Sequence, residues 1–147
     1  MPEFVTDRTQ AHVNLLNRLR KKPWSQMSAS EKVAWYGDAA KGAYNYTDLN
    51  RVESAVAEIG SILGLALTTK TNWNVWDEPT QADMSRYIGN VAKIRQRCEY
   101  VPNLPTLPSS MSNLDYKGAN NIEIVLKRAY ESFATSIQSG EIYCGEV

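Results

Sequence analysis

The stretch that decides the fold is DLNRVESAVAEIGSILGLAL, residues 48–67, because its apolar residues return at the spacing of a helix. These residues recur at intervals of three and four, and they are Val52, Ala55, Val56, Ile59, Leu63 and Ala66. The spacing predicts a long amphipathic helix that buries one stripe. Gly60 and Gly64 each lower helix propensity, so we expect them to lie at a tight contact with a neighbouring helix.

Two further helices are predicted before this one. The first spans about residues 7–20 and begins with a capping pair, Asp7 and Gln10. The second opens on a capping box that starts at Ser28, and it ends at Gly42. Its packing surface is expected to come from Trp24, Val33, Trp35 and Tyr36.

Two more helices are predicted in the second half of the chain. One opens at Pro79 and Thr80 and aligns Met84, Tyr87, Ile88, Val91, Ile94 and Cys98. Three prolines in the stretch at 99–113 predict an extended segment that lies across the bundle. The last helix aligns Ala119, Ile122, Leu126, Ala129, Tyr130, Phe133 and Ile137. The sequence therefore predicts one all-α domain, residues 1–147, a bundle of four to five helices with irregular aromatic-rich loops and a short extended C-terminal tail.

The charge balance argues against a strongly charged partner. Sixteen Lys and Arg residues offset sixteen Asp and Glu residues, so we expect neither a nucleic acid nor a membrane as partner. The basic run at 18–22 is interpreted as cations at the end of a helix. No stretch resembles a membrane span or a secretion signal, so we expect the protein in the cytoplasm of the producing cell, unless a larger assembly carries it out.

No cofactor is expected from the motifs present. A single histidine, His12, and two distant cysteines, Cys98 and Cys144, do not form a metal-binding pattern, and glycine-rich phosphate loops are missing. Asp77, Glu78 and Asp83 could serve a small cell-wall hydrolase as acid and base, which is one alternative. Acidic residues are also favoured at a helix start, and that interpretation is preferred.

Aromatic residues beside polar ones are the candidates for interaction. Trp73 and Trp76 lie in one loop with asparagines and Asp77, a combination that suits stacking on a sugar, although loop tryptophans more often fill gaps between helix ends. Tyr44 and Tyr46 precede a helix that Thr47 or Asp48 is expected to cap. The candidate interaction residues are Tyr44, Tyr46, Trp73, Trp76 and Asp77.

A short internal echo links two of the predicted helix starts. Residues 41–43, Lys-Gly-Ala, are followed by Asn-Arg-Val-Glu at 50–53, and the same Lys-Gly-Ala at 117–119 is followed by Asn-Asn-Ile-Glu at 120–123. A polar residue three positions before a glutamate is typical of a helix N-terminus. The echo suggests that equivalent turns of two helices meet the same environment, as in a duplicated unit.

Five segments together resemble a family of tail-associated proteins of phages and prophages of low-GC Gram-positive bacteria. They are FVTDRTQAHV (4–13), KGAYNYTDLNRVESAV (41–56), WNVWDEPTQADMSRYIGNVAKIR (73–95), LDYKGANNIEIVLKRAY (114–130) and SGEIYCGEV (139–147). The resemblance covers nearly the whole chain. The recurrent positions of that family are occupied here by Asp48, Asn50, Arg51, Glu53, Trp73, Asp77, Pro79, Thr80, Asn120 and Glu123.

The resemblance implies a non-enzymatic structural or attachment component of the virion tail or baseplate. Its partners would be other phage tail proteins, with self-association and host wall glycan as further expectations. No catalytic residue carries over from the family. Two alternatives stay open beside it: a carbohydrate-binding module that recognises the host wall, and the small cell-wall hydrolase named above.

Overall fold

The computed structural model describes residues 2–138, with side chains up to residue 133, and this part of the chain is helical and contains no strand. The all-α prediction is therefore confirmed. The predicted C-terminal tail and Cys144 lie outside the described residues. The elements are α1 Gln10–Leu19, the 3₁₀ turn η1 Trp24–Gln26, α2 Ala29–Tyr36, α3 Asp38–Lys41, α4 Tyr46–Leu63, α5 Gln81–Arg97 and α6 Tyr116–Gln138.

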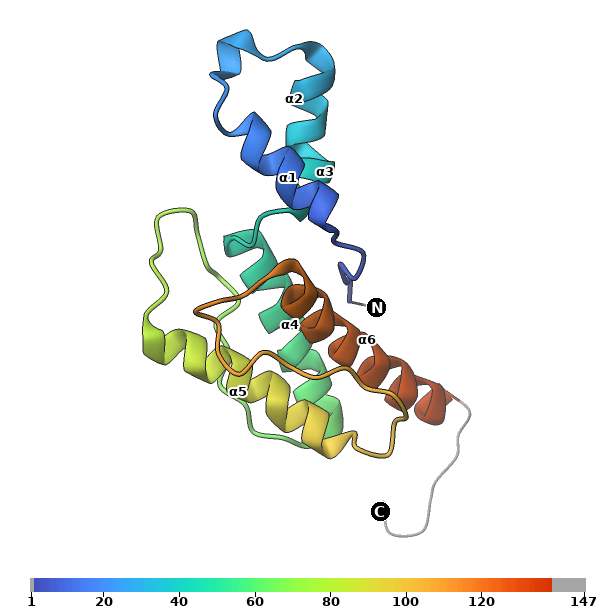
Figure 1. The fold of residues 1–147 in the computed structure, drawn as a ribbon. Coiled ribbons are helices and arrows are strands. Elements are labelled where there is room, and N and C mark those ends of the chain that lie inside the picture. Colours follow the sequence, from blue (N-terminus) through green and yellow to red (C-terminus); the bar gives the residue numbers. More distant parts are fainter. Residues whose placement is uncertain (1, 139–147) are drawn as a thin grey trace.

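The three longest helices, α4, α5 and α6, pack against one another and form the main core (Figure 1). The predicted stripe of α4 is buried there, with the exception of Ala66, which follows the helix. Facing it are Val91 and Ile94 from α5 and Ile122 and Leu126 from α6. Full burial of a Val, Ile or Leu side chain contributes about 1.5–3 kcal/mol, so these residues of all three helices together stabilise the core.

The segment between α5 and α6 is extended, as its prolines predict, and runs back across the helices (Figure 1). Its apolar residues pack half-buried on the main core, and they are Val101, Leu104, Leu107, Met111 and Leu114. Arg95 of α5 holds it by donating to the carbonyls of Leu104 and Pro105.

Residues 10–43, which we call the arm, project from the main core and carry α1, α2 and α3 (Figure 1). The arm has a small core of its own, made of Leu19, Met27 and Ala39. Gly42 lets α3 approach α1 closely, because a Cβ at this position would lie 2.4 Å from the carbonyl oxygen of His12.

The helix starts agree only in part with the sequence. Ser28 opens α2 with the predicted capping box, but α2 ends at Tyr36, and Gly37 separates it from α3. Thr9 caps α1, whereas Asp7 pairs with Lys41 instead. The prediction that Asp7 caps this helix was wrong.

Asn45 caps α4, so the prediction of Thr47 or Asp48 as the cap was also wrong. The Asn45 side chain accepts the Thr47 N–H at 2.9 Å, and the Asp48 carboxylate accepts the Asn45 N–H at 2.9 Å. Asparagine serves here because its side-chain oxygen satisfies a backbone donor that the first turn leaves unpaired.

The prediction for the two glycines of α4 was wrong as well. Gly64 ends the helix in the left-handed conformation, with φ 70°, and a Cβ there would meet nothing within 4 Å. A Cβ on Gly60 would lie 3.0 Å from Leu67, which belongs to the chain after the helix and not to a neighbouring helix. The α-helix therefore stops at Leu63, four residues before the predicted end.

Candidate functional site

A set of hydrogen bonds holds residues 5–8, the N-terminal strap, on α6. The Arg8 N–H donates to Asn120 Oδ1 at 3.0 Å, and Asn120 Nδ2 donates back to the Arg8 carbonyl at 2.9 Å. Three residues earlier, the Val5 N–H donates to Glu123 Oε1 at 3.0 Å. Two side chains one helical turn apart thus fix the backbone of the strap.

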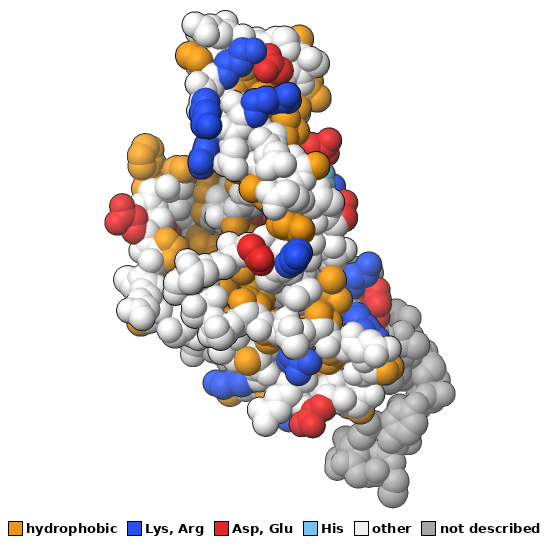
Figure 2. Space-filling view, in the orientation of Figure 1, with side chains coloured by type: hydrophobic (Ala, Val, Ile, Leu, Met, Phe, Trp, Pro, Cys, Tyr) orange, Lys and Arg blue, Asp and Glu red, His pale blue; other side chains and the backbone are white. Residues whose placement is uncertain are grey.

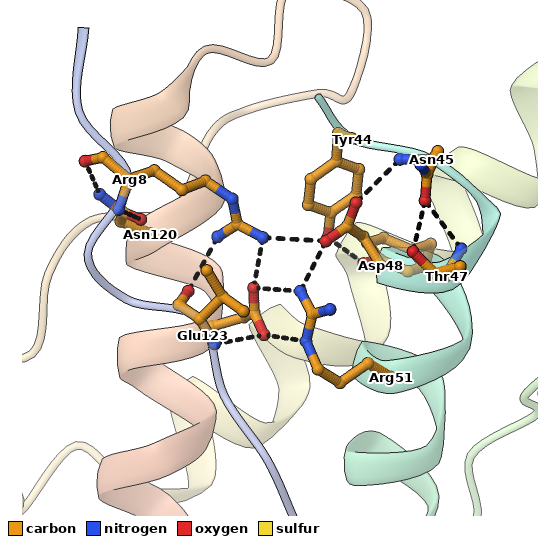
Figure 3. Close-up of polar contacts among 10 residues, drawn as sticks. Arg8, Tyr44, Asn45, Thr47, Asp48, Arg51, Asn120 and Glu123 are labelled. Atoms are coloured by element: carbon orange, nitrogen blue, oxygen red, sulfur yellow. Dashed lines mark hydrogen bonds and ion pairs between the residues drawn. The ribbon is translucent and has the colours of Figure 1, made fainter. Parts of the chain in front are cut away.

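Buried charges complete this arrangement (Figure 3). The Glu123 carboxylate is buried and accepts from Arg8 at 2.7 Å and from Arg51 at 2.8 and 2.9 Å. Asp48 bonds the same two arginines at 3.1 and 2.7 Å. Burial alone would lower the pKa of Arg51, but its bonds to Glu123 and Asp48 raise the pKa above its ordinary value. Each of the two carboxylates is thus paired with both arginines, the arrangement that buried ionic groups need.

A second arrangement of the same kind holds residues 70–73, the inner strap, on α4. The Trp73 N–H donates to Asn50 Oδ1 at 2.7 Å, and Asn50 Nδ2 donates to the Trp73 carbonyl at 2.8 Å. The Lys70 N–H donates to Glu53 Oε1 at 3.0 Å. Glu53 also accepts from the Trp73 indole at 2.6 Å and from Arg86 at 2.5 and 3.2 Å.

The echo in the sequence therefore marks two equivalent structures, which we call the Asn–Glu clamps. In each, the asparagine bonds both backbone groups of one strap residue, and the glutamate accepts the N–H three residues earlier. A second repeat went unnoticed in the sequence: Thr-Gln-Ala follows the N-terminal strap at 9–11 and the inner strap at 80–82. Both threonines are helix N-caps, so the strap, the cap and the clamp recur together.

The recurrent positions named by the resemblance are thus occupied by residues that hold the structure together. Asn50, Glu53, Asn120 and Glu123 form the clamps, and Trp73 is a strap residue. Asp48 and Arg51 belong to the charge cluster, and Thr80 caps α5. Arg8 takes part in one clamp, although no local pattern in the sequence distinguishes it. Its Nε is the buried side-chain nitrogen without a hydrogen-bond partner among the described residues.

Tyr44, an interaction candidate, faces inward. Its hydroxyl is hydrogen-bonded to the hydroxyl of Tyr87, and its ring lies 5.4 Å from the Arg8 guanidinium. Burial raises the pKa of both phenols above the ordinary value. Tyr44 therefore packs on the main core and contacts the N-terminal strap through Arg8. Tyr46, the other tyrosine candidate, is the first residue of α4 and is partly exposed.

The structure separates the two loop tryptophans. Trp73 is 4% exposed and fills the main core, whereas Trp76 is 88% exposed. The turn that carries Trp76 is fixed, since Asn74 Oδ1 accepts the Trp76 N–H at 2.9 Å and Asp77 accepts the Asn74 N–H at 2.9 Å. The plug interpretation is correct for Trp73 and wrong for Trp76. Asp77, another candidate, shapes the turn that presents Trp76.

The three carboxylates considered as a catalytic group, Asp77, Glu78 and Asp83, have separate environments. Asp83 forms the capping box of α5 with Thr80, whose hydrogen bonds lower the pKa of Asp83. Asp77 bonds the Asn74 N–H and lies 3.5 Å from Lys70. Glu78 is exposed. A general acid needs a raised pKa, and Asp83 is shifted in the opposite direction.

The arm carries a second exposed aromatic surface. Trp24 and Tyr36 meet edge to face with ring centroids 5.9 Å apart, and the Lys32 ammonium lies 5.1 Å from the Trp24 ring. Val33, one turn before Tyr36, is 75% exposed and Tyr36 is 76% exposed. The prediction that Trp24, Val33 and Tyr36 supply the packing surface of this helix was wrong, because all three are exposed. Trp35, from the same prediction, does pack against the small core of the arm.

A cleft of about 450 Å³ lies between the arm and the start of α6. Its lining residues include Arg8, Tyr44, Lys41 and Lys117. Within the described residues, no group of three or more His, Cys, Asp or Glu side chains is placed to hold a metal ion, and no helix is long and apolar enough to cross a membrane.

Comparisons with family models, with curated proteins and with solved structures found no match.

Proposed function

We propose that this chain is a structural component of a phage or prophage tail or baseplate that acts through protein–protein assembly. The observation that supports the proposal best is the exposed Trp76 on its fixed turn. An exposed tryptophan costs solubility, and a rigid one loses little entropy on binding, so it is suited to anchor an interface.

The use of the polar residues also supports a structural role. The buried carboxylates of the clamps all bond arginines or strap N–H groups. These groups hold two straps against the helices. A chain that must present surfaces in an array gains from such rigidity. The proposed location is the virion tail.

Mass spectrometry of phage particles purified after induction of the source strain tests this proposal. We expect the wild-type chain in the particles, and we expect Trp76→Ala to be depleted from them while its amount in the cell is unchanged. Tyr100→Ser is the matched control, because Tyr100 is an exposed aromatic residue that follows the last residue of α5, whereas the loop precedes the first residue of that helix. Absence of the wild-type chain from particles would overturn the proposal.

A carbohydrate-binding role is the second candidate, and the exposed indole of Trp76 favours it. Stacking of a sugar on a flat aromatic face needs polar side chains nearby. Asn74 and Asp77 are close, although both bond the loop backbone. Co-sedimentation with purified host wall glycan tests this role, and Trp76→Ala should abolish the binding if the role is correct.

A further inference from the structure

We propose that the loop at 74–79 of one copy binds the arm of a second copy, so that the chain associates head to tail. The inference deepens the proposed function and rests on it, because a tail component acts through contacts of this kind. It is carried by three observations: the distribution of charge, the aromatic surface of the arm and the shape of the loop.

Charge is separated along this neutral chain. The arm carries six Lys and Arg against two Asp and Glu, a net charge of +4, so the rest of the chain carries −4. Figure 2 shows Lys and Arg side chains gathered over the arm. The stretch at 74–85, by contrast, has three acidic residues and no basic one, a net charge of −3. Two surfaces of opposite sign attract each other and steer association.

The positive surface includes apolar area that the chain leaves exposed. Trp24, Val33 and Tyr36 form it, and Lys32 stands over the Trp24 ring. Lys21, three positions before Trp24 in the sequence, is also exposed. Aromatic rings and cations in one patch suit a partner that offers both an aromatic group and carboxylates.

The loop at 74–79 offers this chemistry. Val75 and Trp76 project from it, 64% and 88% exposed, and the exposed Glu78 follows within two residues. Because hydrogen bonds of Asn74 and Asp77 fix the turn, Trp76 needs little ordering on binding. The loop is thus a small, rigid projection that offers an exposed indole and the carboxylate of Glu78, while Asp77 is paired with Lys70.

The two surfaces belong to different copies. The far end of the arm, with η1 and α2, lies apart from the loop between α4 and α5 (Figure 1). Contacts between like surfaces would set positive arm against positive arm, or acidic loop against acidic loop, which charge repulsion disfavours. A contact between two different surfaces generates a ring where the rotation closes and a filament where it does not.

Two variants disable one surface each. Trp24→Ala with Lys32→Glu removes an aromatic group and reverses a charge on the arm, and Trp76→Ala with Glu78→Lys does the same on the loop. The control for both is Tyr100→Ser with Lys93→Glu, because these residues are also exposed but lie on neither surface. Circular dichroism and thermal unfolding of each variant verify that it is folded.

Sedimentation velocity on the purified proteins, at concentrations up to about 1 mM where a contact of about −4 kcal/mol is populated, measures association. We expect the wild type and the control to associate, and each surface variant to be monomeric, with affinity reduced at least tenfold. Added salt should weaken the association of the wild type, since it screens exposed charges.

Mixing the two variants decides between the arrangements. Each variant retains the surface that the other has lost, so an equimolar mixture should form a 1:1 dimer that does not grow further. A monomeric wild type would overturn the inference. It would also be overturned if the loop variant still self-associated through its arm, if the arm variant still self-associated through its loop, or if the mixture stayed monomeric. Particle mass spectrometry decides the proposed function independently of this result.

Discussion

Glu53 of α4 and Glu123 of α6 occupy equivalent places in the two Asn–Glu clamps. Each accepts a backbone N–H from its strap, a side-chain donor from the strap residue three positions later, and two nitrogens of an arginine. In each clamp the asparagine lies one turn before the glutamate on the same helix. The N-terminal strap thereby joins the start of the chain to its last described helix.

We predict that Glu123→Gln destabilises the protein by about 3–5 kcal/mol, because it removes the charge that faces two arginines in a buried site. Glu53→Gln should cost less, since the Arg86 side chain is 23% exposed whereas that of Arg8 is 2% exposed. Urea unfolding followed by circular dichroism measures both. Glu99→Gln, an exposed position, is the control and should change stability by less than about 0.5 kcal/mol. Equal stability of Glu123→Gln and the control would show that the clamp does not stabilise the fold.

Substituting alanine for Gly89 and for Gly64 should change the stability of the protein in opposite directions. Gly89→Ala in α5 should stabilise the protein by up to about 1 kcal/mol, because a Cβ there meets nothing within 4 Å and alanine favours helix. Gly64→Ala should destabilise it by about 1 kcal/mol, because φ is 70° at that position. Thermal unfolding of the two variants side by side measures the difference. A stabilising Gly64→Ala would contradict the left-handed cap.

The features that were predicted correctly from the sequence are those that depend on residues close together in the chain. The stripe of α4 and the Ser28 capping box were correct because their signals lie within a few residues. The predicted end of α4 was wrong because Ala66 continues the apolar spacing beyond Gly64, a glycine that ends the helix in the left-handed conformation. That Gly64 caps the helix and does not pack inside it depends on backbone conformation, which periodicity does not report.

The candidate site was harder to predict because burial of a loop residue depends on distant partners. Trp73 and Trp76 lie in one loop, yet of the two only Trp73 bonds Asn50 and Glu53. These partners lie 23 and 20 positions earlier in the chain. Arg8 carries no local signal, and its partners come from two helices far along the chain. The internal echo was the one sequence signal that led to these long-range contacts.

The Tyr44–Tyr87 pair predicts a loss of stability at alkaline pH. The pKa of both phenols is raised in the folded protein, so folding holds their protons more tightly than the unfolded chain does. This contribution is complete below about pH 10, the ordinary pKa of tyrosine, and declines as the pH rises above it. Unfolding free energy and tyrosinate absorbance measured from neutral to alkaline pH test this. Tyr87→Phe should flatten the decline, and Tyr100→Phe, at an exposed position, should leave it unchanged.

The last prediction separates the two loop tryptophans, because a variant that removes both would mix a core effect with a surface effect. Trp73→Ala should cost about 3–5 kcal/mol, since it empties a buried position and leaves Glu53 without the indole donor. Trp73→Phe keeps most of the ring and should cost about 1–3 kcal/mol, the penalty of an unmade buried hydrogen bond.

Trp76→Ala should change stability by no more than about 0.5 kcal/mol, because the side chain has almost no contact to lose within the chain. Urea unfolding measures the free energy of unfolding of the three variants. Acrylamide quenching tests which tryptophan is exposed. Loss of Trp76 should remove an accessible component of the fluorescence, whereas Trp73→Phe should leave that component in place. If Trp76→Ala instead destabilised the fold as strongly as Trp73→Ala, the indole of Trp76 would be part of the core, and the loop could not present it to a partner.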